Sequence, residues 1–75
     1  MVLQEGKVNH SYVVERIDLP LQLERRLEAL GIISGTVVRV LNRKEHGALV
    51  IFVRGTRFAI GRGIAENIQV REALQ

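Results

Sequence analysis

The chain has 75 residues, a formal net charge of +3 and no cysteine, which predicts one domain spanning residues 1–75 and excludes disulfides and thiolate metal sites. Hydrophobic residues make up 47% of the chain and aromatic residues only 4%, so aliphatic side chains must supply the core, and their β-branched bias favours strands. Neither a signal-peptide pattern near Met1 nor an apolar run of the ~20 residues that span a membrane occurs, so we expect a cytoplasmic protein without direct membrane insertion.

The first half of the chain predicts one strand followed by one amphipathic helix. The strand covers Ser11 to Ile17, which is rich in residues with high β propensity. Pro20 suits the first turn of a helix, because its missing N–H has no helical partner there. We therefore expect a helix over Leu21 to Leu30, ended by Gly31 in a left-handed conformation. Three leucines recur at helical spacing on one face and predict packing against the domain: Leu23, Leu27 and Leu30.

The second half predicts four more short strands separated by glycine-containing turns. In the third strand, alternation places Leu49, Ile51 and Val53 on one face and leaves Val50 and Phe52 on the other. We expect a helical turn over residues 65–67 and a frayed tail over residues 71–75. The expected strands are Thr36 to Asn42, Leu49 to Val53, Arg57 to Ile60 and Ile68 to Val70.

These elements predict a mainly β fold, a small SH3-like barrel of about five strands with one α-helix between strands 1 and 2. Barrel closure would also hide strand edges that otherwise promote aggregation. All three aromatic residues fall in predicted strands, and we assign them to the core: Tyr12, Phe52 and Phe58.

The residues that enzymes use for catalysis are nearly absent. Covalent catalysis needs a nucleophile beside a base, and acid–base catalysis often uses two carboxylates in different environments. The chain offers two serines, Ser11 and Ser34, and a single aspartate, Asp18. We therefore predict no enzyme activity, no catalytic residues and no cofactor.

Candidate metal ligands are few and scattered. A tight site needs three or four converging ligands. Glu45 and His46 are adjacent in a predicted loop, and His10 lies far away in the sequence. We predict no metal site, while leaving open whether Glu45 and His46 form a weak one.

The basic excess indicates either an acidic protein partner or nucleic acid. The stretch from Gly35 to Val40 resembles the start of short RNA-binding barrels in ribosomal proteins. Single-strand binding, however, usually needs exposed aromatic platforms, and the small charge excess limits counterion release from phosphates. We therefore favour a protein partner and keep nucleic-acid binding as the alternative hypothesis.

Several strings, taken in order, resemble the FeoA domain family. Residues 26–32 (RLEALGI) and 34–40 (SGTVVRV) are similar to the family pattern R-L-x-x-L-G-x-x-x-G-x-x-V-x-V. Residues 54–60 resemble its G-x-x-x-A-L stretch, and residues 65–70 resemble its closing A-x-x-I-x-V. Ser34 stands where many members have proline, Ile60 replaces a common leucine, and Gly61 interrupts the segment that follows. The resemblance extends from about Gly6 to Val70.

The resemblance implies a small cytosolic accessory protein of a bacterial ferrous-iron transport system. Such proteins act by contact with the cytosolic, GTP-binding region of the membrane ferrous-iron permease, and the family is associated with iron. The same domain forms the C-terminal module of metal-dependent repressors, so a stand-alone relative of that module is a further alternative. Self-association stays open.

Because core residues cannot meet a partner, the candidate partner-binding residues are exposed cations: Arg25, Arg26, Arg39, Arg43, Lys44, Arg54 and Arg57.

Overall fold

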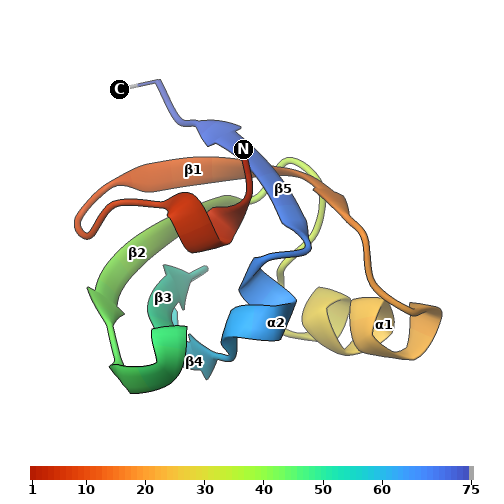
Figure 1. Ribbon diagram of the computed structural model, residues 1–75. Coiled ribbons are helices and arrows are strands. Elements are labelled where there is room, and N and C mark those ends of the chain that lie inside the picture. The colour runs from red at the N-terminus through yellow and green to blue at the C-terminus, as the bar shows by residue number, and fades with distance from the viewer. Residues whose placement is uncertain (75) are drawn as a thin grey trace.

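The computed structural model describes residues 1–74, in which five strands, two α-helices and two 3-10 helices follow one another (Figure 1). The strands form one antiparallel sheet in the order β4-β3-β2-β1-β5. This confirms the mainly β, SH3-like fold with a helix between the first two strands. The elements are η1 (Leu3–Glu5), β1 (Ser11–Ile17), α1 (Leu21–Ala29), β2 (Val37–Arg43), η2 (Glu45–Gly47), β3 (Leu49–Val53), β4 (Thr56–Ile60), α2 (Arg62–Ala65) and β5 (Ile68–Glu72).

The sheet curls strongly but does not close within the described residues. Strands β4 and β5 are its two edges and do not pair with each other. Closure was expected to hide strand edges, and this expectation is wrong for β4. The N-terminal segment covers part of the other edge, because Val2 bridges Gln69 and the Val70 N–H donates to the Met1 carbonyl at 2.8 Å.

Alternation along the strands divides their side chains between a core face and an outer face, as the sequence predicts. Leu49, Ile51 and Val53 are buried, whereas Phe52 is 41% exposed. In β2, the buried Val38 and Val40 alternate with the exposed Val37 and Arg39. The buried hydrophobic side chains form one cluster: Leu3, Tyr12, Val14, Leu27, Ile32, Val38, Val40, Leu49, Ile51, Val53, Ile60, Ala65, Ile68 and Val70.

A two-residue turn joins β3 to β4. Val53 pairs with Thr56, and the two residues between them, Arg54 and Gly55, have φ angles of 50° and 85°. Positive φ at both central positions is the requirement of a type I′ turn, whose twist matches that of the flanking strands. Glycine adopts this conformation without strain, so Gly55 fixes the register of the hairpin.

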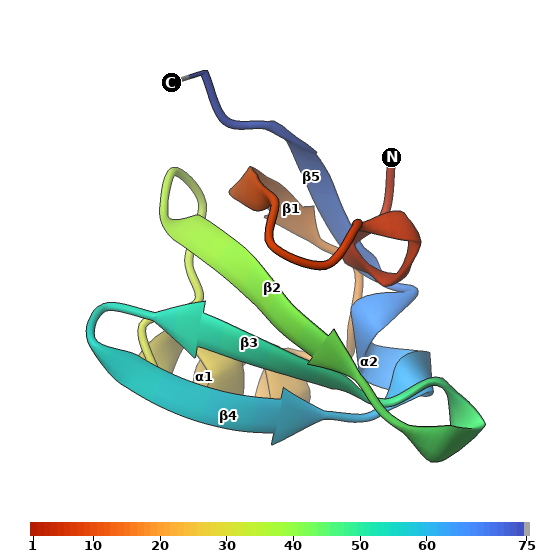
Figure 2. The same ribbon diagram turned by 90° about the vertical axis from the view of Figure 1, so that its left-hand side faces the viewer.

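Helix α1 begins after Pro20, whose carbonyl accepts the N–H groups of Leu23 and Glu24, each at 3.0 Å. Gly31 follows the helix and has a φ of 93°, the left-handed conformation expected of the glycine that terminates it. The helix lies behind β3 and β4 in Figure 2, on the core side of the sheet.

The predicted three-leucine packing face of α1 is confirmed for Leu27 and wrong for Leu30. Leu27 is buried, but Leu23 is only half-buried and Leu30 is 43% exposed. Ile32, which follows the helix, is fully buried. The turn after the helix therefore carries the contact that the periodicity assigned to Leu30.

The N-terminal segment belongs to the fold, which the sequence pattern did not reveal. Leu3 in η1 is completely buried. The Lys7 N–H donates to the Tyr12 hydroxyl at 2.7 Å. The Arg43 guanidinium donates to the carbonyls of Gln4 and Gly6 at 2.9 and 2.8 Å.

The C-terminal predictions need two corrections. The helical turn expected over residues 65–67 lies instead at Arg62–Ala65, because Gly61 is extended and its carbonyl accepts the Ala65 N–H. Strand β5 continues to Glu72, since Tyr12 pairs with Glu72 and Val13 with Arg71. Arg71 and Glu72 are therefore not frayed, and Gln75 of the expected tail lies outside the described residues. Strands β1 and β3 have the expected boundaries, and the boundaries of α1, β2 and β4 differ from expectation by one residue.

Candidate functional site

The exposed sides of β2, β3 and β4 form one surface, called here the outer face, which faces the viewer in Figure 2. Phe52 lies at its centre, paired with Arg39 of β2 on one side and Arg57 of β4 on the other. Phe52 was assigned to the core, and this is wrong. The strand alternation that buries Ile51 and Val53 turns the ring toward solvent.

The outer face contains a shallow hollow beside Phe52. A register shift between Val40 and Asn42 marks an irregularity in β2, which leaves Leu41 out of the ladder with β3. Leu41 and Val50 are half-buried and supply the apolar part of the hollow. The hollow measures about 500 Å³ and is lined by Leu41, Asn42, Lys44, Val50 and Arg57.

The outer face is strongly basic. Strands β2, β3 and β4 contain no acidic residue, and residues 36–60 hold five Lys and Arg against the single carboxylate of Glu45. The ion pairs of the described residues all lie elsewhere: Arg16 with Asp18, Arg62 with Glu66, and Arg71 with Glu15. Arg39, Lys44 and Arg57 therefore present exposed charge that residues 1–74 do not neutralise by direct pairing.

The structure brings only three of the seven predicted cations together on the outer face, namely Arg39, Lys44 and Arg57. The guanidinium of Arg43 is engaged with the N-terminal segment. Arg54 lies in the β3–β4 turn, where its aliphatic stem packs against Gly31. Arg25 and Arg26 are exposed on α1, on the core side of the sheet (Figure 2).

Phe52, Leu41 and Val50 are three apolar outer-face residues that sequence reasoning did not select. Once Leu49, Ile51 and Val53 are assigned to the core, alternation alone requires Phe52 and Val50 to point outward. The alternation in the sequence was therefore enough to predict that these two side chains are on the outer face. The position of Leu41 depends on the irregularity in β2, for which the sequence has no marker.

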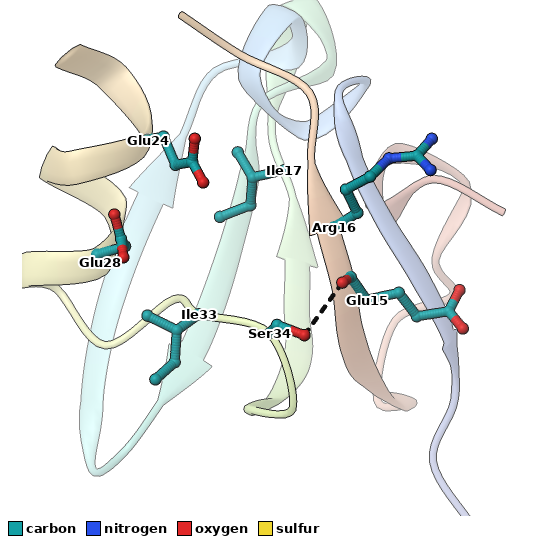
Figure 3. Close-up of a pocket in the computed structure, with 7 residues that line it drawn as sticks. All are labelled: Glu15, Arg16, Ile17, Glu24, Glu28, Ile33 and Ser34. Atoms are coloured by element: carbon teal, nitrogen blue, oxygen red, sulfur yellow. Dashed lines mark hydrogen bonds between the residues drawn. The ribbon is translucent and has the colours of Figure 1, made fainter. Parts of the chain in front are cut away.

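A second concave surface, the α1–β1 groove, has the opposite charge (Figure 3). Glu24 and Glu28 lie on successive turns of α1, with Glu24 pointing toward Ile17, and Ile33 lies on the segment that follows the helix. The groove measures about 370 Å³ and is lined by Glu15, Arg16, Ile17, Glu24, Glu28, Ile33 and Ser34. The Ser34 hydroxyl donates to the Glu15 carbonyl at 3.1 Å and ties the groove floor to β1.

Arg16 at the rim of this groove is engaged by Asp18. Its Nε donates to Asp18 Oδ1 at 2.7 Å and its Nη2 donates to Oδ2 at 3.1 Å. The hydrogen bond from Arg16 lowers the pKa of Asp18, and the same bond raises the pKa of Arg16. The positive charge of Arg16 is therefore paired with Asp18 and does not neutralise Glu24 and Glu28 in the groove.

The candidate metal ligands do not converge. Across residues 1–74, no group of three or more His, Cys, Asp and Glu side chains has a geometry that could hold a metal ion. Glu45 and His46 are exposed in η2. The absence of a tight metal site stays a prediction for titration. The described helices also include none with the length and apolar character needed to cross a membrane.

Comparisons with known proteins point to one family. Residues 1–72 match the model of the FeoA domain. A protein of Methanocaldococcus jannaschii, provisionally named Fe(2+) transport protein A, is 34% identical over 68 residues, which cover 91% of this chain and 82% of that protein.

Two solved structures extend this likeness to the fold. The FeoA protein of Chlorobium tepidum superposes with a TM-score of 0.92 at 27% identity, covering 99% of this chain and 71% of that one. The zinc-complexed FeoA of Stenotrophomonas maltophilia, described as an SH3 domain protein, gives a TM-score of 0.80 at 34% identity. The match covers 95% of this chain and 89% of that one.

Proposed function

This chain belongs to the FeoA domain family, and from that membership we propose that it is a non-enzymatic accessory protein of a ferrous-iron transport system. It acts in the cytoplasm by docking on the cytosolic, GTP-binding region of the membrane permease. The outer face is the docking surface. The observation that supports this assignment is the exposed Phe52, placed between Arg39 and Arg57 on strands that contain no acidic residue.

The outer face combines the residue types that dominate binding energy in protein interfaces. Arginine and aromatic side chains are enriched among the residues whose truncation costs most. The planar guanidinium pairs with carboxylates in a bidentate manner and also stacks on rings. The hollow formed with Leu41 and Val50 adds apolar surface beside these groups. A three-strand face on a domain of 75 residues fits a small, transient interface.

The test is a titration of the chain with the soluble cytosolic domain of a ferrous-iron permease. A double variant Arg39→Glu and Arg57→Glu should weaken binding at least tenfold, because it reverses both charges beside Phe52. The matched control is Arg25→Glu with Arg26→Glu, which changes the net charge equally on α1. Phe52→Ala should also weaken binding, while thermal unfolding should show that every variant remains folded.

The outcomes separate the surface from the role. Equal losses in the two double variants would show that net charge, rather than the outer face, controls docking. A larger loss in the α1 variant would move the interface to the helix. If the unaltered chain binds neither the soluble domain nor the full-length permease in membranes, the transporter role is refuted.

The exposed Phe52 also favours a second candidate, single-stranded RNA. An aromatic ring beside arginines on a strand is a stacking platform for bases, and its exposure removes the sequence argument that placed all aromatics in the core. One exposed ring and three outer-face cations can engage few phosphates, so we expect only weak, salt-sensitive binding. Sub-micromolar binding to an RNA at physiological salt, abolished by Phe52→Ala, would favour this candidate over the transporter role.

A further inference from the structure

We propose that the segment recognised by the outer face is an acidic extended strand of the partner protein, which adds to the open edge of β4 as a sixth strand. This inference rests on the proposed function, because the segment is expected to belong to the transporter partner. It goes further by specifying the conformation and the residue pattern of what binds.

The hairpin geometry determines which main-chain groups of β4 are available. In a two-residue turn, the flanking residues Val53 and Thr56 form a hydrogen-bonded pair, and such pairs alternate with pairs that are not hydrogen-bonded. Phe58 and Ile60 therefore direct their N–H and C=O groups toward β3. Arg57 and Ala59 direct theirs away from β3, to the edge of the sheet.

Nothing in the described chain pairs with that edge. Strand β4 is the terminal strand of the sheet, and the backbone hydrogen bonds outside the ladders include none to Arg57 or Ala59. Both residues are exposed. Figure 2 shows β4 as the lower boundary of the sheet, with α1 behind it rather than alongside its free edge. The opposite edge, at β5, is partly occupied by the N-terminal segment.

The surroundings of the edge define the chemistry of the added strand. Its side chains on the outer face would lie next to Arg57 and Ala59, beside strands that contain no acidic residue and that also carry Arg39. Its alternate side chains would lie on the core side, next to the half-buried ring of Phe58. Charge complementarity outside and an apolar neighbour inside together select a strand in which acidic and apolar residues alternate. Edge addition of this kind takes affinity from main-chain bonds and specificity from alternate side chains.

Amide exchange in the full chain tests the proposal directly. The probes are the soluble cytosolic domain of a ferrous-iron permease and a synthetic eight-residue peptide in which glutamate alternates with valine. A peptide of the same composition with four glutamates followed by four valines is the control for alternation. We expect the Arg57 and Ala59 amides to exchange at least tenfold more slowly in the bound state, with little change at the Phe58 amide, which is already bonded to β3.

A variant at Ala59 provides an independent measurement. Ala59→Pro removes the outward N–H and leaves the β3–β4 ladder intact, because proline is tolerated at edge positions whose N–H faces solvent. It should weaken binding by about fivefold or more, the loss of one net hydrogen bond. Ala59→Ser keeps the N–H and should bind as the unaltered chain does. If the proline variant is unfolded, the exchange measurement on the unaltered chain still tests whether a strand adds to the edge of β4.

The failure of this inference differs from the failure of the proposed function. If the permease domain binds while the Arg57 and Ala59 amides exchange as before, edge addition is overturned and the transporter role stands. If the permease domain does not bind but the alternating peptide protects both amides, the transporter role fails and edge recognition is supported. Equal protection of both amides by the two peptides would overturn the alternating residue pattern of the added strand. If neither peptide nor the permease domain protects these amides, edge addition itself is overturned.

Discussion

Replacing Leu3 by alanine tests whether the N-terminal segment is a structural part of the domain. Leu3 is completely buried in the same cluster as Tyr12 and Val40, although it is the third residue of the chain. Truncating a buried leucine to alanine removes its transfer free energy and leaves a cavity, which together cost about 2–5 kcal/mol. The segment is held by hydrogen bonds to Tyr12 and Arg43, so it cannot collapse freely into the space. We expect a loss of about 3 kcal/mol.

A loss of this size is large for the chain. At roughly 0.05–0.15 kcal/mol per residue, a domain of 75 residues has a free energy of unfolding of roughly 4–11 kcal/mol. The melting temperature should fall by roughly 12–24 °C, since domains of this size lose about 4–8 °C per kcal/mol. Urea unfolding and calorimetry measure both quantities. The matched control is Leu74→Ala, because Leu74 is 99% exposed near the other terminus. A loss below about 1 kcal/mol for Leu3→Ala, or equal losses for the two variants, would refute the structural role of the segment.

Three further predictions concern the turn, acid stability and metal. In urea unfolding, Gly55→Ala should destabilise the fold by about 1–2 kcal/mol, because the φ of 85° at this position disfavours a side chain. The control Gly61→Ala should be nearly neutral, because Gly61 has a φ of −72° and open space around it. The hydrogen bond from Arg16 lowers the pKa of Asp18 in the folded state, so the pair stabilises the fold at neutral pH, and this contribution is lost as the pH falls below about 4. Asp18→Asn should remove that part of the dependence of unfolding on pH. An unchanged pH profile of stability in this variant would contradict the assignment. Equimolar ferrous iron or zinc should leave the amide spectrum unchanged, and a saturable shift at Glu45 and His46 would reveal a metal site.

The candidate surface could be predicted only in part, because charge is visible in a sequence and proximity is not. The list of exposed cations included Arg39, Lys44 and Arg57, which share the outer face. It also included Arg43, whose donors are used by backbone carbonyls of Gln4 and Gly6. Those carbonyls lie 37 or more positions away in sequence, so nothing local could show that this side chain is engaged.

Local patterns alone determined the five strands and the first α-helix of this protein. The period of two in residues 49–53, the proline before Leu21 and the glycine at position 55 act over a few residues, so strand, helix start and hairpin turn were readable without a structure. Only the tertiary structure decided which ends of the chain are buried and which strand edge stays open. Leu3 fills the core because β5 passes beside the N-terminal segment, and the outer edge of β4 stays unpaired because the sheet curls without bringing β4 to β5. Both outcomes depend on contacts between distant residues, which the hydrophobicity of any one segment does not encode.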